Sequence, residues 1–266
     1  MSPWEIYQDR IQAHGGTKRG AGYVREVRTL RDKLPDSLSY HHATIFSPEN
    51  GFNITEETWR ELGDERDVAI INSDNLNEKY IYSLPEEDIE LGSLVSWMDN
   101  YWLVTERDAN TTVYTRAKLL QCNYLLKWIA KDGTIIEQWC AVEDGTKYLT
   151  GEFEDRHFIV VRGDSRIAVT IARNRYTTKL GRENRFLIDD PDSELKLAYT
   201  LSKPFKLTGT YNNHGIFKFV LQEVETTEND NQDLMIADYY KVFPRETDTS
   251  VQPDPGQSAG GKKVWL

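Results

Sequence analysis

The first 35 residues carry the hydrophobic spacing of two amphipathic helices. Trp4, Tyr7 and Ile11 recur at i, i+3 and i+7, which places them on one stripe of a short helix. A second stripe follows a glycine-rich stretch, with the spacing i, i+4, i+7 and i+11: Tyr23, Val27, Leu30 and Leu34. Pro35 ends this helix, because the residue before a proline is disfavoured in the helical region. Two such short helices cannot form a core by themselves, so we expect them to dock on another surface.

From residue 40 the pattern changes to a period of two, which is the period of strands. The predicted strands span residues 40–46, 68–71, 79–84, 92–97, 101–105, 134–142, 157–161, 167–171, 185–188, 195–201 and 215–221, and residues 111–129 form a long β-prone run. A short helix is expected at 55–62, and Asp132-Gly133 between two apolar runs indicates a hairpin. Helix-length segments do not alternate with these strands, which argues against a parallel α/β sheet. We therefore expect a mainly β fold, an antiparallel β-sandwich or small β-barrel, in one β domain or two.

The pattern changes again near the C-terminus. Residues 225–233 are polar and acidic, and residues 234–243 form a short apolar patch that we expect to add little to a core. Residues 247–261 are rich in Pro, Gly, Ser and Asp, which predicts extended chain. The expected organisation is an N-terminal helical arm (1–39), an antiparallel β body (40–224), and an acidic linker with an extended C-terminal arm (225–266).

Composition indicates a folded protein. Only 39% of the 266 residues are apolar, yet Trp, Tyr and Phe reach 11%, and disordered chains are poor in aromatic residues. No apolar run approaches the roughly 18 residues of a membrane-spanning helix. The first ten residues lack the basic and apolar blocks of a signal peptide. We expect a soluble, non-secreted protein in which Cys122 and Cys140 are buried thiols rather than a disulfide.

The net charge of −11 is distributed unevenly. Residues 1–42 carry 7 basic and 5 acidic groups, whereas residues 43–110 carry 4 basic and 16 acidic groups. A domain that grips DNA needs the opposite balance, because phosphate contacts come from Lys and Arg. The acidic segment therefore either solvates loops or repels a polyanion and keeps it from adhering to the surface.

The search for catalytic chemistry finds no constellation. The five histidines lack metal-binding spacing, and the sequence has neither a phosphate-binding loop nor a nucleophile-elbow motif. Gly15, Gly16, Gly20 and Gly22 lack the preceding strand of a dinucleotide site, so we interpret them as flexibility between two helices. Nothing among the 43 acidic residues singles out the carboxylate pair of a glycosidase. We expect no enzyme activity, no metal and no cofactor.

The tryptophans of the β region allow two interpretations. They either fill the core or form a sugar-stacking platform like that of a carbohydrate-binding module: Trp59, Trp97, Trp102, Trp128 and Trp139. Large aromatic residues in alternating strands usually fill the core, so we favour that interpretation.

Five segments carry a resemblance to a known group of proteins. They are Trp4–Ile11, the hairpin of residues 91–106, Tyr124–Trp128, Leu180–Asp189 and Tyr199–Lys203. Through these segments, and through its β body with terminal arms, the chain resembles the neck proteins of tailed bacteriophages, the head-tail connector or head-closure (stopper) group. The likeness spans most of residues 1–243.

The resemblance implies a non-enzymatic virion structural protein. Such a protein assembles as a ring that joins the portal and capsid to the tail and surrounds or closes the DNA channel. Its partners would be copies of itself, a portal or adaptor protein, tail proteins, and double-stranded DNA that passes without sequence-specific binding, with no membrane involved. It would lie in the neck of the virion and, during assembly, in the host cytoplasm. The alternatives are another tail-side structural protein, a carbohydrate-binding β module, and a hydrolase with an unrecognised carboxylate pair.

We expect the subunit interface on the two terminal arms. Its candidate residues are apolar or basic: Trp4, Ile6, Tyr7, Ile11, Tyr23, Arg25, Val27, Arg28, Leu30, Arg31, Val264, Trp265 and Leu266. The three arginines are expected to face a protein partner. Part of the acidic load of residues 43–110 or 222–254 is expected to face the channel, where repulsion lets DNA slide.

Overall fold

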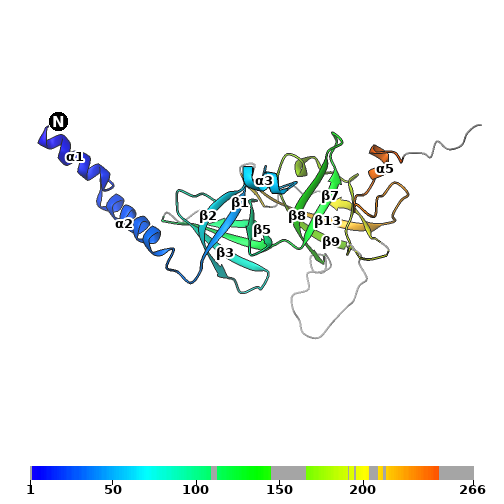
Figure 1. Ribbon diagram of the computed structural model, residues 1–266, viewed down its shortest axis with the longest axis horizontal. Coiled ribbons are helices and arrows are strands. Elements are labelled where there is room, and N and C mark those ends of the chain that lie inside the picture. The colour runs from blue at the N-terminus through cyan, green and yellow to red at the C-terminus, as the bar shows by residue number, and fades with distance from the viewer. Residues whose placement is uncertain are drawn as a thin grey trace, which may run out of the picture.

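The computed structural model describes residues 2–108, 113–144, 166–190, 192–194, 196–203, 209–211 and 214–245. Two antiparallel sheets lie side by side, and two N-terminal helices extend away from the first of them (Figure 1). The expected fold class is confirmed: the protein is mainly β and barrel-like, with helices at its N-terminus. The predicted strand 157–161 and the apolar tip of Val264, Trp265 and Leu266 lie outside the described residues.

Six strands close the first barrel in the order β1-β2-β3-β6-β5-β4. Their bounds are β1 (Tyr40–Phe46), β2 (Asp64–Asn72), β3 (Glu78–Ser83), β4 (Leu94–Trp97), β5 (Asn100–Asp108) and β6 (Thr115–Gln121). Alternate residues point inward along each strand, as Trp102 and Val104 do on β5, and these two side chains are buried. The expected short helix is α3 (Glu56–Leu62), which connects β1 to β2.

The second sheet is nearly closed. It has the order β10-β11-β13-β9-β8-β7, with β12 added beside β13. Its strands are β7 (Tyr124–Ile129), β8 (Ile135–Asp144), β9 (Arg166–Ala172), β10 (Arg185–Leu187), β11 (Ala198–Lys203), β12 (Thr210–Tyr211) and β13 (His214–Val224). The edge strands β7 and β10 approach each other, since the Tyr124 hydroxyl donates a hydrogen bond to the Leu187 carbonyl at 3.1 Å. The Asp132-Gly133 turn joins β7 to β8 as predicted, and Gly133 adopts the positive φ of 84°.

The long β-prone run 111–129 contains two strands, β6 and β7, which belong to different sheets. The chain leaves the first barrel at Cys122, whose backbone N–H donates to the Tyr101 carbonyl at 2.8 Å. It enters the second sheet at Asn123, whose side-chain amide both donates to and accepts from the backbone of Val142, each at 2.8 Å. An asparagine that mimics a strand neighbour in this way replaces the missing ladder bonds, and no glycine or proline marks the break.

Both cysteines are free and buried, as the sequence predicts. Burial raises the pKa of the Cys122 thiol to about 12 and that of Cys140 well above its ordinary value. Because the thiolate is the reactive form, neither side chain reacts readily while the protein is folded. We expect a thiol-specific dye to modify the native protein at pH 8 only at the rate of unfolding, and to modify both cysteines at once in denaturant. Fast modification of the native protein would contradict this burial.

Residues 225–245 are packed against the second sheet, which differs from the linker and extended arm expected there. Met235 and Ala237 are buried with Leu187 of β10, Ile236 between them is also buried, and the short helix α5 (Tyr239–Val242) follows them. This segment has no periodic sequence pattern because its backbone is irregular: among the described residues its only ladder-like contact is the Asn231–Ile236 bridge. It also forms an ion cluster with the sheet.

That cluster is centred on Arg185 of β10. Its guanidinium donates two hydrogen bonds to the Asp230 carboxylate, both at 3.0 Å, and one to Asp238 at 2.9 Å. The Asp230 side chain is fully buried and also accepts from the backbone N–H groups of Thr227 and Asp238. A buried carboxylate with every oxygen satisfied in this way holds an irregular segment in one place.

Candidate protein interface on the N-terminal arm

The arm consists of α1 (Pro3–Ala13) and α2 (Lys18–Lys33), and its first turn is well capped. Ser2 and Glu5 form a reciprocal capping box, and Pro3 occupies the first helical position, where its missing N–H costs nothing. Local sequence therefore specifies where α1 begins. It does not supply α1 with a packing partner, because none of the 11 residues of the helix is buried.

The aromatic stripe predicted from the sequence is exposed on α1. Trp4 and Tyr7 stack on each other with ring centroids 5.6 Å apart and remain 64% and 54% exposed. Ile11 continues the stripe and is 40% exposed. Ile6 is also exposed, but a helix turns by about 100° per residue, so Ile6 lies roughly 160° around the axis from Trp4. We call Trp4, Tyr7 and Ile11 the arm stripe.

The glycine-rich stretch forms a defined elbow, whereas the sequence suggested only flexibility. Gly15 and Gly16 have φ of 93° and 68°, and the N–H of Gly16 donates to the Ile11 carbonyl at 2.8 Å. This is the helix-ending turn that favours glycine at both positions. Thr17 then caps α2 by accepting from the Gly20 N–H at 3.0 Å. Gly15 and Gly20 touch through their backbones, since a Cβ on Gly20 would lie 1.9 Å from the Gly15 oxygen.

A methyl group at Gly20 is therefore expected to open the elbow. Gly20→Ala should shift and broaden the distance between spin labels placed on introduced cysteines at the exposed positions Gln8 and Glu26, as measured by pulsed electron resonance. Gly22→Ala is the matched control, because its Cβ meets nothing within 4 Å and alanine adds about 1 kcal/mol of helix propensity. Identical distance distributions for Gly20→Ala and the unsubstituted protein would contradict the backbone contact.

The lower half of α2 fixes the arm to the first barrel. Val27 and Leu34 are buried, Leu30 is half-buried, and the Arg31 guanidinium pairs with Glu86 at 2.9 Å. Val27 and Arg31, expected at a subunit interface, thus contact their own chain, and we leave them out of the interface developed below. Tyr23, nearer the elbow, remains 41% exposed.

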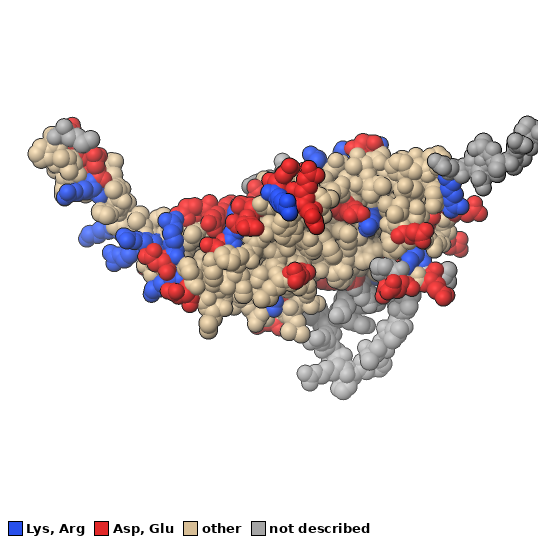
Figure 2. Space-filling model, viewed as in Figure 1, with Lys and Arg blue, Asp and Glu red and all other residues tan. Residues whose placement is uncertain are grey.

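The outer part of the arm carries unpaired positive charge. Arg28 makes only a long, exposed contact of 3.9 Å with Asp32. Within the part of the chain that the structure describes, four further cations form no ion pair: Arg10, Lys18, Arg19 and Arg25. Figure 2 shows Lys and Arg gathered along the arm, and Asp and Glu over the region of α3.

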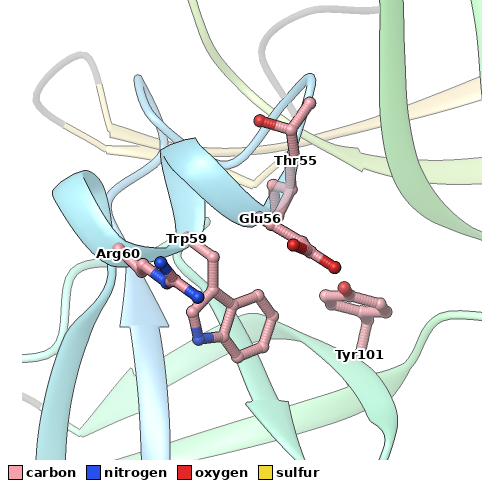
Figure 3. Close-up of a pocket in the computed structure, with 6 residues that line it drawn as sticks. Thr55, Glu56, Trp59, Arg60 and Tyr101 are labelled. Atoms are coloured by element: carbon pink, nitrogen blue, oxygen red, sulfur yellow. The ribbon is translucent and has the colours of Figure 1, made fainter.

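A pocket of about 400 Å³ lies beside α3, where the first barrel meets the second sheet. Trp59 and Tyr101 form its aromatic wall at a ring separation of 6.3 Å, and Arg60 lies beside the indole while Glu56 points towards Tyr101 (Figure 3). Tyr101 in turn stacks on Trp139 of β8 at 4.6 Å. Burial raises the pKa of Tyr101, so its hydroxyl stays protonated at neutral pH. We call this cavity the aromatic pocket.

The surface next to the aromatic pocket is acidic, and we call it the rim; of its carboxylates Glu56 lines the pocket itself, beside the exposed cation Arg60. Thr55 caps α3, and the helix then exposes carboxylates towards solvent. Among the described residues, four carboxylates of α3 and the start of β2 form no ion pair: Glu56, Glu57, Glu61 and Glu65. The pocket has no signal in the sequence, because its two walls come from residues 42 positions apart and only the fold brings Trp59 beside Tyr101.

The tryptophans divide between core and surface. Trp102 and Trp128 are 4% and 3% exposed, which confirms the core interpretation for them. Trp97 and Trp139 are half-buried, and only Trp59 lines the aromatic pocket. A continuous sugar platform is therefore excluded for these five residues.

A larger groove, of about 1050 Å³, lies between the two sheets. Its charges are largely paired with each other, as in the 2.8 Å contact of Lys118 with Glu78. Burial raises the pKa of Glu78, but hydrogen bonds from Lys118 and Asn75 outweigh it and the net pKa is lowered. In the described residues no group of three or more His, Cys, Asp or Glu could hold a metal ion, and no described helix is long and apolar enough to span a membrane.

Comparisons with known proteins give little guidance. No family model and no curated protein matches the chain. A solved structure that does match is that of K. pneumonia MrkH in its apo state, with 11% sequence identity over 80% of this chain and 88% of that chain. The TM-score of 0.24 is too low to support any inference about fold or function.

Proposed function

We propose that this chain is a non-enzymatic structural protein of the head-tail neck of a tailed bacteriophage, where its copies form a ring around the DNA channel. The observation that supports this proposal is the exposed arm stripe on a helix that buries none of its own residues. The proposal also rests on the sequence resemblance to neck proteins.

A helix like α1 needs a partner for thermodynamic reasons. Isolated helices shorter than about 12–15 residues are marginal in water, and α1 has 11 residues. Burying a large apolar side chain contributes about 1.5–3 kcal/mol, and this gain is realised for the arm stripe only against another subunit. Burial of the arm stripe therefore favours assembly of the chains independently of the β body.

The charge of the body is compatible with a DNA channel. Residues 43–110 carry a net charge of −12, and much of it lies on exposed carboxylates of α3 and β2. A negative lumen repels phosphate and lets the duplex slide, whereas basic side chains would bind it. Which carboxylates line the channel depends on how the copies are oriented in the ring.

The proposal is tested by the mass of the full-length protein, alone and mixed with purified portal rings of the same phage. We expect a discrete ring on the portal in mass photometry and in negative-stain micrographs. A chain that never joins portal rings and is absent from purified virions by immunolabelling would overturn the assignment.

A carbohydrate-binding module is the second candidate, and one observation favours it. The aromatic pocket combines Trp59 and Tyr101 with the charged groups of Glu56 and Arg60, a combination that suits a sugar ring stacked on an aromatic face. A glycan array probed with the full chain separates the candidates, since a neck protein gives uniform null results.

A further inference from the structure

We propose that the arm of one copy docks on the α3 region of a second copy, with the aromatic tip of α1 seated in the aromatic pocket. This inference rests on the proposed ring and identifies the contact that builds it. The inserted residues are Trp4 and Tyr7, and the receiving wall is formed by Trp59 and Tyr101.

The arm cannot place Trp4 and Tyr7 in the aromatic pocket of its own chain. Its lower half is anchored to the barrel by buried Val27 and Leu34 and by the Arg31–Glu86 ion pair. From that anchor α2 and α1 extend away from the body, whereas α3 lies over the junction of the two sheets (Figure 1). The contact is therefore intermolecular and heterologous, and such contacts close into a ring when the rotation between copies allows it.

The charges of the arm and of the surface around the aromatic pocket are complementary. The outer arm presents the four unpaired cations Arg10, Lys18, Arg19 and Arg25, and the rim beside the pocket presents the four unpaired carboxylates Glu56, Glu57, Glu61 and Glu65, which outnumber the pocket's one cation, Arg60. Both sets belong to exposed residues on helices or at strand ends, so neither has to leave a partner in order to meet the other. Opposed patches of this kind set the orientation and specificity of an interface more than its total affinity.

The shape and chemistry of the pocket suit an aromatic tip. A cavity of about 400 Å³ has room for large side chains, and aromatic rings prefer the edge-to-face and offset contacts that Trp59 already makes with Phe46 and Tyr101. Anchors of this type, surrounded by a charged rim, are typical of the residues that dominate interface energy. The contact would bury the arm stripe, which the chain by itself leaves in water.

Charge reversal on full-length protein tests the contact. One variant reverses the arm, Lys18→Glu/Arg19→Glu, and the other reverses the rim, Glu57→Lys/Glu61→Lys. Each alone is expected to lower the association of copies by at least about tenfold in sedimentation velocity, and mixing the two variants should restore it to within about threefold of the unsubstituted protein. Restoration follows because the reversed arm of one variant then meets the reversed rim of the other.

The matched control is Glu228→Lys/Asp233→Lys, which reverses two exposed carboxylates on the far segment of the chain. It should associate normally, and all variants should keep the melting temperature of the body.

If the rim variant associates normally, or mixing restores nothing, the docking site is wrong even where the chain still joins portal rings. If the mixed variants assemble but never bind portal rings, the contact stands and the neck assignment fails. A glycan that binds the aromatic pocket without competing against association would favour the carbohydrate site and overturn the proposal.

Discussion

Replacing Trp4 and Tyr7 together with alanine is expected to abolish assembly at concentrations where the unsubstituted chain forms rings. The two side chains are 64% and 54% exposed, so their burial in an interface contributes roughly 0.6 of the full burial energy of about 1.5–3 kcal/mol for each, or about 2–3.5 kcal/mol together. At about 1.4 kcal/mol per factor of ten, affinity should fall between about 30-fold and about 300-fold. Mass photometry of the full chain measures this loss.

The same variant should leave the β body unchanged, because α1 buries none of its residues. Ile6→Ala is the control: Ile6 is 43% exposed on the same helix but lies off the arm stripe, so the variant should assemble with little change. Equal losses for Ile6→Ala and for the double variant would show that general hydrophobicity, rather than the arm stripe, drives association.

Asp230→Ala is expected to lower the free energy of unfolding by about 3–5 kcal/mol, which is the cost of removing one partner from a buried ion pair. The substitution leaves the Arg185 guanidinium short of two hydrogen bonds and leaves the backbone N–H groups of Thr227 and Asp238 without their acceptor. Urea unfolding measures the loss. Hydrogen exchange at the Ile236 amide, which donates to Asn231, should show residues 225–245 opening first.

Asp233→Ala serves as the control, since Asp233 is exposed on the same segment, and it should change stability by less than about 0.5 kcal/mol.

The contribution of Asp230 to stability depends on pH in a defined direction. Burial raises the pKa of Asp230, but hydrogen bonds from Asp238, Thr227 and Arg185 outweigh it and the net pKa lies below its ordinary value. Its stabilisation is therefore complete above the ordinary carboxyl pKa and is lost as the pH falls towards the lower, folded value. A variant that loses as much stability on acidification as the unsubstituted protein would contradict this role.

The sequence predicted the elements whose patterns are local. The periods of the two helices, the hairpin at Asp132-Gly133 and most strands follow from spacing and turn residues within a few positions. The division of 111–129 between two sheets was not predictable, because the break at Cys122-Asn123 depends on contacts with Tyr101 and Val142. The docking of 225–245 was missed for a related reason: it depends on Arg185, a single cation about 45 residues earlier.

The sequence likewise predicts part of the candidate interface and not the rest. The arm stripe of Trp4, Tyr7 and Ile11 was visible as a helical period, and the structure places it in solvent. Burial of Val27 was not visible, since a stripe does not reveal whether its own body or a partner covers it. The aromatic pocket had no sequence signal, because Trp59 and Tyr101 converge only after β1, β4 and β5 have paired.

In the part of the chain that the structure describes, the crossing from the first barrel to the second sheet lies at Cys122-Asn123, and the strand pairs of the barrel lie within residues 40–121. A ribosome releases those residues before any of the second sheet, so the barrel can close its hydrogen bonds while the rest of the chain is still being made. The junction side of the nascent barrel then offers Phe46, Leu94 and Leu103 as a ready surface. We expect the later strands to complete their sheet against that surface as they emerge, which gives synthesis from the N-terminus a template for the second half.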